Sequence, residues 1–489
     1  MTLARNTLYN LAGAIVPMIL ALVTVPLYLR QIGEARYGIL AIVWLLLGYF
    51  GSFDLGLSRA AANRIAQLRD APSTERQEVF WTACFLNAGL GLLAGIAFYF
   101  LGVRLFEAWL KMSGPLHVEA TVALPWIAAA VPVATVTAAF TGALEGLQRF
   151  ATVNAIQALG TALFQLVPLI TAVLLGPQLQ YVIPAAVISR VVTLAPLMAA
   201  VKSALPLNAP PKLNRQKMRK LFAYGSWVTI TNVVGPILHV FDRFLIGIVL
   251  GTTDVAYYVV PFQLVNRAQL VPGALSRALF PHFSAVNTRQ ARQVARESVI
   301  ALAAVMTPMI IAGLLFMASF LQIWVGRKFA SHATPVGEIL LLGIWINGLA
   351  FVPFALLQAR GRPDIVAKFH LLELIPFLAL LWIALHRFGI VGAAAVWVLR
   401  VALDAVLLFN AAHIPMRLAK PLIPSATLIA ATVVGLSVAP HERVLTKLYF
   451  GLPILLLSCS WSLIISARLR TLVSHFLRQL NISQIFLGN

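Results

Sequence analysis

The sequence has little charge, and acidic residues are especially few. Asp, Glu, Lys and Arg make up 11% of the 489 residues, with 16 acids against 37 bases, so the formal net charge is +21. Soluble domains carry about 25% charged residues. Hydrophobic residues make up 60% of the chain, and apolar runs of membrane-spanning length recur along it. This composition predicts an all-α, polytopic membrane protein.

Cysteine and the common catalytic motifs are also scarce. Cys84 and Cys459 are the two cysteines, and both lie in apolar runs, which excludes a disulfide framework and a Cys/His metal site. The sequence contains no Gly-x-x-x-x-Gly-Lys-Ser/Thr loop and no His-Glu-x-x-His. The longest outer loop, 103–118, is too short for a catalytic domain. We therefore expect neither an enzyme nor a bound metal or cofactor.

Apolar segments divide the chain into about fourteen predicted transmembrane helices. A helix needs about 20 residues to cross a hydrocarbon core of about 30 Å. The predicted limits are 7–30, 37–58, 80–102, 119–143, 155–175, 181–201, 221–249, 256–275, 297–322, 334–357, 365–386, 390–412, 421–439 and 446–467.

The basic residues predict how these helices are oriented. With the N-terminus inside, 24 of the 37 Lys and Arg fall in inner segments and nine in outer segments. This excess follows the positive-inside rule and predicts that both termini are cytoplasmic. The charge lies in short loops rather than on a soluble face, so we expect contact with membrane lipids and no nucleic-acid partner.

A sequence repeat divides the chain into two six-helix bundles. Asn10-x-x-Gly13 resembles Asn232-x-x-Gly235, Gly33 corresponds to Gly251, and Leu57-Ser58-Arg59-Ala60 corresponds to Leu275-Ser276-Arg277-Ala278. Six helices per copy give both copies the same orientation, related by a pseudo-twofold axis along the membrane normal. We predict bundles at 1–201 and 221–412, a basic cytoplasmic linker at 202–220, and two extra helices with a tail at 413–489.

Four arginines within the predicted helices are candidate substrate contacts. Arg190, Arg267 and Arg400 lie near the predicted membrane midplane, and Arg243 lies nearer the outer edge. A charge there costs about 2.5–3.5 kcal/mol on insertion scales and often marks a binding site or pathway. One guanidinium group can donate two hydrogen bonds to two phosphate oxygens at once, so we expect an anionic substrate. The alternative is structural pairing, of Arg400 with Asp404 and of Arg243 with Asp242.

A polar stripe and a few acids complete the candidate residues. Asn232 and His239 share one helix face with Arg243 and are further candidate substrate contacts. Glu373, three residues after His370, is a candidate ion-coupling group, as are Asp242 and Asp404. We interpret Asp54 as a helix-end partner of Arg59.

Several segments together resemble a known family. They are Pro26-Leu27-Tyr28-Leu29-Arg30, Phe53-Asp54-Leu55-Gly56-Leu57, Gly225-Ser226-Trp227, Phe241-Asp242-Arg243-Phe244-Leu245-Ile246-Gly247 and Phe280-Pro281. They are similar to helices one, two, seven and eight of bacterial polysaccharide transporters and O-antigen flippases, in the multidrug/oligosaccharidyl-lipid/polysaccharide exporter superfamily. The resemblance covers roughly residues 1–412.

The resemblance implies a function in the bacterial inner membrane. Such a flippase moves an undecaprenyl-diphosphate-linked oligosaccharide, an O-antigen or exopolysaccharide repeat unit, to the outer leaflet by alternating access. Its expected partners are this lipid-linked substrate, a polysaccharide polymerase and other assembly proteins. A lipid II flippase and a cation-coupled multidrug exporter remain alternatives in the same architecture. A membrane glycosyl polymerase or ligase fits less well, because the outer loops are short.

Overall fold

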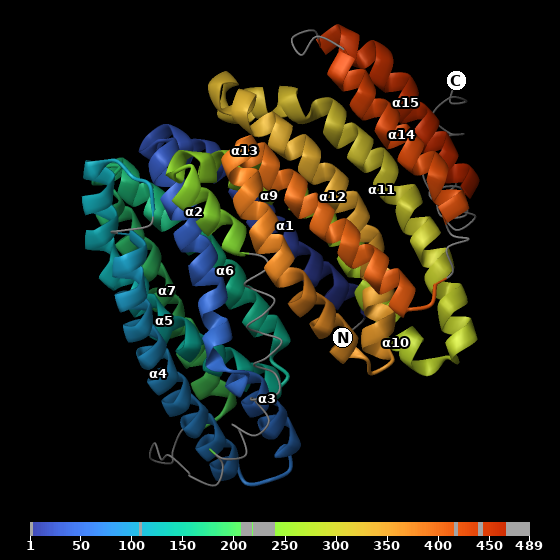
Figure 1. Cartoon of the computed structure of the whole chain (residues 1–489). Coiled ribbons are helices and arrows are strands. Elements are labelled where there is room, and N and C mark those ends of the chain that lie inside the picture. Colours follow the sequence, from blue (N-terminus) through green and yellow to red (C-terminus); the bar gives the residue numbers. More distant parts are fainter. Residues whose placement is uncertain are drawn as a thin grey trace, which may run out of the picture. The chain divides into compact units, whose positions relative to one another are not determined.

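The structure is a computed structural model of the whole chain, and it describes residues 3–106, 110–206, 218, 240–414, 419–438 and 444–465. Every regular element within these ranges is helical (Figure 1). Contacts between the elements divide the chain into two compact units, Met1–Val259 and Val260–Asn489. Most of the predicted linker lies outside the described residues.

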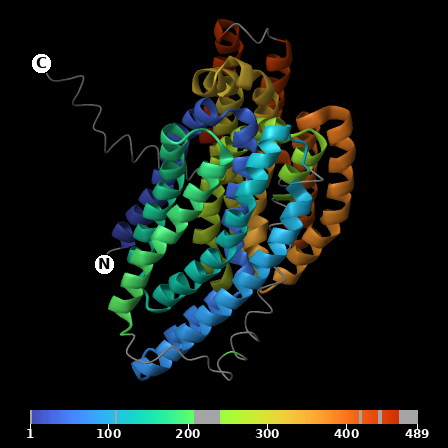
Figure 2. The ribbon, with the colours of Figure 1, turned by 90° about the vertical axis from the view of Figure 1, so that its left-hand side faces the viewer.

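The first unit is an α-helical bundle in which α5 has a central place. Helices α4 and α7 both pack along α5, α6 packs along α7, and α1 packs along α6. Figure 2 shows these long helices side by side. The elements are α1 (Leu3–Ile32), α2 (Glu34–Tyr49), the 3-10 helix η1 (Phe50–Asp54), α3 (Leu57–Gln67), α4 (Ser73–Arg104), α5 (Gly114–Gly146), α6 (Phe150–Leu174), α7 (Leu179–Ala204) and the helical residues 240–249.

Small residues bring the helices of this unit close together. A Cβ atom built on Gly95 of α4 would lie 2.8 Å from the carbonyl oxygen of Ala128 on α5. On Gly142 of α5 it would lie 2.5 Å from the carbonyl oxygen of Ser58 on α3. Since backbones approach this closely only at glycine or other small residues, these two positions fix how α3 and α4 pack on α5.

The second unit is built around α11 and α12, which pack along each other. On one side α12 packs against α10 and α13, and on the other α11 packs against α14 and α15. Its elements are the end of α9 (Thr252–Asn266), the 3-10 helix η3 (Arg267–Gln269), α10 (Leu270–Ala285), α11 (Thr288–Val325), α12 (Arg327–Ala359), α13 (Pro363–Ala411), α14 (Ala419–Val438) and α15 (Val444–Ile465).

Helix α13 contains two predicted transmembrane segments joined by a turn. Gly389 has φ 59° and ψ −146°, a non-helical conformation that interrupts the helix. Arg400, after the turn, bonds to Glu373, before it. The predicted segments 365–386 and 390–412 are therefore the two arms of a hairpin, and glycine permits the positive φ at its tip.

The sequence repeat corresponds to a repeated local structure. In the first copy α2 leads through η1 into α3, and in the second α9 leads through η3 into α10. Gly33, before α2, and Gly251, before α9, both have positive φ, 80° and 121°. The sequence predicted each of these segments as one continuous helix, at 37–58 and 256–275, and it was wrong on that point. A short 3-10 segment interrupts both.

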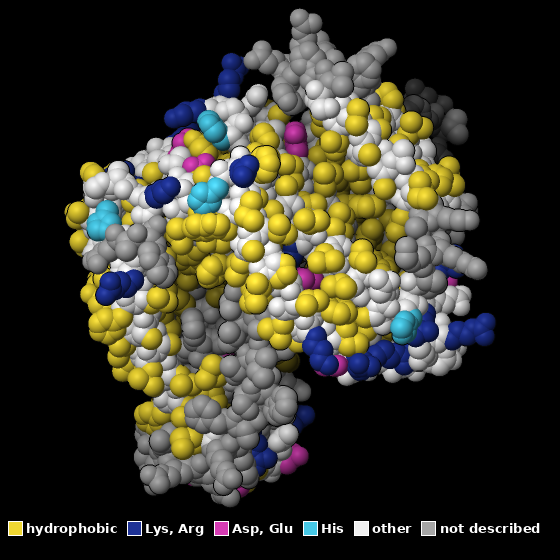
Figure 3. Space-filling model, in the orientation of Figure 1, with side chains coloured by type: hydrophobic (Ala, Val, Ile, Leu, Met, Phe, Trp, Pro, Cys, Tyr) yellow, Lys and Arg dark blue, Asp and Glu magenta, His cyan; other side chains and the backbone are white. Residues whose placement is uncertain are grey.

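The described chain has the lengths and surface of a multi-pass membrane protein. Seven helices are long and apolar enough to span a membrane, and one of these is α13, which contains two arms. Three shorter apolar helices, Met18–Ile32, Leu422–Ser437 and Gly451–Ile465, also occur in the described ranges. Apolar side chains cover most of the described surface in Figure 3. Such a surface is stable against lipid rather than water.

Candidate substrate site

A polar cavity of about 350 Å³ lies within the first unit. Residues from η1, α2, α3, α5, α6 and α7 line it, so it opens between helices that are far apart in sequence. Its charged and amide side chains are those of Asp54, Arg59, Glu145, Gln157 and Arg190. This cavity contains one of the arginines that the sequence predicted as substrate contacts.

Arg190 is held in this cavity by an aromatic ring. Its Cζ atom lies 4.3 Å from the centroid of the Phe164 ring, in a cation–π contact. Its Nε is buried without a hydrogen-bond partner, and none of the ion pairs among the described residues includes Arg190. Trp44 packs against the same ring, with 6.0 Å between centroids. Among the described residues, Arg190 thus presents a positive charge that no carboxylate pairs with at contact distance.

Asp54 lines the same cavity, but its role differs from the sequence interpretation. The carboxylate accepts hydrogen bonds from the backbone N–H of Gly56, at 2.8 Å, and of Ser58, at 3.1 Å. It therefore caps the first turn of α3, where helix N–H groups need acceptors. The interpretation of Asp54 as the partner of Arg59 is wrong. Arg59 is exposed and lines the cavity separately.

Arg243 and Asp242 form a buried pair in the first unit. Arg243 is 4% exposed and Asp242 is 0% exposed. The Arg243 NH1 group donates to Asp242 Oδ1 at 2.5 Å, and the hydroxyl of Tyr258 donates to Asp242 Oδ2 at 3.0 Å. The guanidinium also lies over the Tyr258 ring. This geometry matches the structural pairing that the sequence left open for Arg243.

Arg267 lies in the second unit, at the start of η3. Its side chain is exposed, and none of the described ion pairs includes it. The 3-10 segment that interrupts the helix thus carries an arginine accessible from outside the unit. Asn266, beside it, is exposed as well.

Three buried charged residues and a histidine meet across the α13 hairpin. Glu373, Arg400 and Asp404 are 2%, 7% and 7% exposed. Arg400 donates from Nε to Glu373 Oε2 at 3.1 Å, and Asp404 lies within electrostatic range of Glu373 and His370. The hydrogen-bonded partner of Arg400 is therefore Glu373, not Asp404, which lies four residues further along the same helical arm. We call these four residues the hairpin cluster.

Asn232 and His239, the other predicted substrate contacts, lie outside the described residues. The polar stripe that they form with Arg243 remains a prediction.

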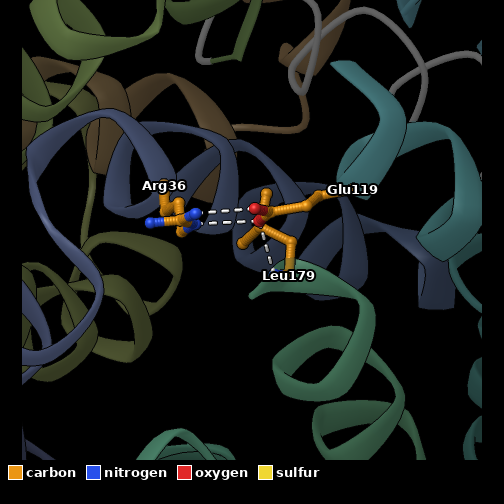
Figure 4. A network of polar contacts seen from close by, with 3 residues as sticks. All are labelled: Arg36, Glu119 and Leu179. Atoms are coloured by element: carbon orange, nitrogen blue, oxygen red, sulfur yellow. Dashed lines mark hydrogen bonds and ion pairs between the residues drawn. The ribbon is translucent and has the colours of Figure 1, made fainter. Parts of the chain in front are cut away.

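A polar network that the sequence did not indicate ties three helices of the first unit together. Arg36 of α2 donates to both carboxylate oxygens of Glu119 on α5, at 2.8 and 2.6 Å, and Leu179 N–H of α7 donates to Glu119 at 3.0 Å (Figure 4). The sequence placed Arg36 in an outer loop and Glu119 at the edge of a transmembrane segment. A pair 83 residues apart has no local spacing by which sequence reasoning could find it.

Comparisons with known proteins extend over most of the chain. A family model described as polysaccharide biosynthesis protein matches residues 3–287. A protein of Shigella flexneri, described as an O-antigen transporter, is 28% identical over 409 residues, 83% of this chain and 97% of its own length.

Two solved structures have a similar fold. The lipid II flippase MurJ, in an inward closed conformation, gives a TM-score of 0.73 at 13% identity, over 95% of this chain and 99% of that one. An inward-facing multidrug resistance MATE family transporter of the MOP superfamily gives a TM-score of 0.70 at 15% identity, over 83% of this chain and 98% of that one. At these identities the similarity shows the fold alone.

Proposed function

Because the chain belongs to the polysaccharide biosynthesis protein family, we propose that it is a flippase for a lipid-linked oligosaccharide. Its substrate is an undecaprenyl-diphosphate-linked repeat unit of O-antigen or exopolysaccharide, carried from the inner to the outer leaflet of the inner membrane. The Shigella flexneri relative, described as an O-antigen transporter, supports this assignment over 83% of the chain. The protein is a transporter and not an enzyme.

The observation that carries this proposal is the Arg190 cavity. A diphosphate bears negative charge and several acceptor oxygens, and the Arg190 guanidinium, which pairs with none of the described carboxylates, attracts it. The space of about 350 Å³ holds a polar group rather than a whole lipid. We assign the diphosphate and the adjoining sugar to this cavity, and the polyprenyl chain to the surrounding membrane.

Among the other arginines, Arg267 is the second proposed contact for the anionic group. It is exposed at the break between α9 and α10. Arg243 and Arg400 are buried, and each bonds to a carboxylate. We propose that these two arginines position their surroundings and do not bind the diphosphate in this state.

Ion coupling is proposed for the hairpin cluster. It holds two buried carboxylates, Glu373 and Asp404, against one guanidinium, Arg400. An unbalanced carboxylate in low dielectric binds a cation or a proton. Asp242 is a weaker candidate, because Arg243 and Tyr258 already satisfy its oxygens.

Alternating access by two six-helix bundles with fourteen spans is the proposed mechanism. The 3-10 segments η1 and η3 lie at equivalent points of the repeat, and a 3-10 stretch within a helix often marks a hinge. Glu34 accepts a 2.6 Å hydrogen bond from Tyr257, and Lys111 donates to the Val249 carbonyl at 2.5 Å. These bonds join the two copies of the repeat on the predicted outer side, as an outer gate would.

The proposed topology has both termini in the cytoplasm. The flippase would supply repeat units to a polysaccharide polymerase on the outer face, because the diphosphate-linked product must be consumed there.

Deletion of the gene tests the function. Undecaprenyl-linked repeat units should accumulate while surface polysaccharide disappears, and the wild-type gene should restore it. Arg190→Ala should fail to restore it at normal membrane protein level, whereas Lys202→Ala, a change of an exposed base on the same helix, should succeed. Accumulation of lipid II with normal surface polysaccharide would instead assign a lipid II flippase. Unchanged lipid intermediates with altered drug tolerance would assign a multidrug exporter.

A further inference from the structure

A second cavity, larger than the Arg190 cavity, lies in the second unit. It measures about 680 Å³ and is enclosed by α11, α12 and the last turns of α14. Neither the repeat nor the proposed transport path accounts for it, and the sequence assigned no role to the helix that forms one of its walls.

The cavity extends along α12 from the end of this helix at the membrane edge toward the middle of the helix. Helices α11 and α12 pack along each other and are joined by Gly326 alone, so they reverse direction there. Both have the length and apolarity of transmembrane helices. Arg327 therefore lies at the membrane edge, while Leu314 and Leu342 lie 13 and 15 residues from it. At 1.5 Å per residue the cavity reaches about 20 Å into the membrane.

Apart from Glu338, its lining is polar near the mouth and mostly apolar further in. Ser331 and Thr334 follow Arg327 on one face of α12, near the mouth. The walls contributed by α11 and α14 are largely apolar, with Leu314, Ala318, Val433 and Leu436. An empty space of this kind would lose dispersion contacts, and water in it would wet apolar walls. An amphipathic ligand satisfies both surfaces.

The charges fix which end of the ligand lies at the mouth. None of the ion pairs among the described residues includes Arg327, so its guanidinium is available to a phosphate. Glu338 lines the cavity eleven residues deeper. The sequence missed this acid, because the predicted limits 334–357 placed it near a segment end.

We propose that this cavity binds one anionic glycerophospholipid. Its phosphate bonds to Arg327, its glycerol region contacts Ser331, and one acyl chain extends between α11 and α14. Such a lipid fills the space between α14 and the α11–α12 pair and so links the C-terminal helix pair to the bundle. This site is separate from the Arg190 cavity and does not depend on the transported substrate.

Binding of phosphatidylglycerol to the delipidated full-length protein, followed by native mass spectrometry, tests the proposal. The wild type should retain one tightly bound lipid. Arg327→Ala, which removes the phosphate partner, and Ala318→Trp, which fills the cavity from α11, should each weaken that binding at least tenfold. The matched controls are Lys328→Ala, an adjacent exposed base outside the lining, and Ala430→Trp, an exposed position on α14. Both should bind like the wild type.

Three outcomes would overturn it. An equal loss of lipid binding in Lys328→Ala would mean that the lipid is attracted to the basic surface in general. Displacement by millimolar inorganic phosphate would mean that only an anion binds. Tighter retention of undecaprenyl phosphate than of phosphatidylglycerol would identify a substrate site instead. A thermal unfolding midpoint for each variant shows whether it is folded. If Ala318→Trp proves unstable, Arg327→Lys replaces it as the second test. This variant retains the charge and should therefore recover part of the lipid binding that Arg327→Ala loses.

Discussion

At the scale of single residues, substitutions of Arg267 test whether substrate binding depends on the positive charge or on the shape of the guanidinium. If this exposed side chain holds the diphosphate, Arg267→Ala should abolish surface polysaccharide, while Arg267→Lys should keep part of it, since lysine attracts phosphate but lacks the two-pronged contact. Arg289→Ala, at an exposed base on α11, should have no effect. Membrane protein level and surface polysaccharide are the two measurements. Normal export in Arg267→Ala would remove this residue from the site.

The hairpin cluster gives a second prediction at this scale. Arg400→Met leaves the Glu373 carboxylate buried without its guanidinium partner and should cost about 3–5 kcal/mol of stability. The double change Arg400→Met with Glu373→Gln should recover much of that loss. Glu373→Gln alone should stay folded yet lose ion-driven transport. Thermal unfolding in detergent and transport into vesicles under an imposed gradient measure the two effects. Equal transport with and without Glu373 would exclude coupling there.

At the scale of helices, the Glu119 network is predicted to hold α2, α5 and α7 together. Glu119→Ala removes two bonds from Arg36 and one from Leu179 N–H. The buried N–H then lacks a partner, at a cost of about 1–3 kcal/mol. Glu119→Gln, which can still accept from Leu179, should cost less. A lower thermal midpoint in Glu119→Ala than in Glu119→Gln is expected, and equal midpoints would contradict the role of the backbone bond.

Helix packing in the first unit makes a further prediction for Gly95. Because a Cβ atom there would lie 2.8 Å from the Ala128 carbonyl oxygen, α4 and α5 must separate in Gly95→Leu. We expect loss of folded protein in the membrane. Gly89, which has open space around its Cβ position, is the matched control on the same helix. A fully stable Gly95→Leu would show that the two helices are not in close contact.

At the scale of the whole molecule, the topology is the property to test. If the chain has fourteen spans and both termini inside, a reporter that is active only in the cytoplasm should be active when it is fused after residue 489. A reporter that is active only outside the cytoplasm should be active when it is inserted in the loop at 103–118. Two reporters on the same side would contradict the eleven spans predicted between the 103–118 loop and the C-terminus.

The sequence by itself determined that the chain is helical and embedded in a membrane, because hydrocarbon requires long apolar segments whose backbone bonds are internal. It also predicted that Gly33 and Gly251 correspond, and both have a positive φ in the structure, whereas the role of Arg190 in substrate binding remains a prediction. Tertiary structure alone decided which charges pair. Glu119 meets Arg36, Arg400 meets Glu373 across a glycine turn, and Asp54 caps α3, because each contact depends on how helices distant in sequence pack or how the chain turns. The same packing created the two cavities, since a void between helices has no pattern along the chain.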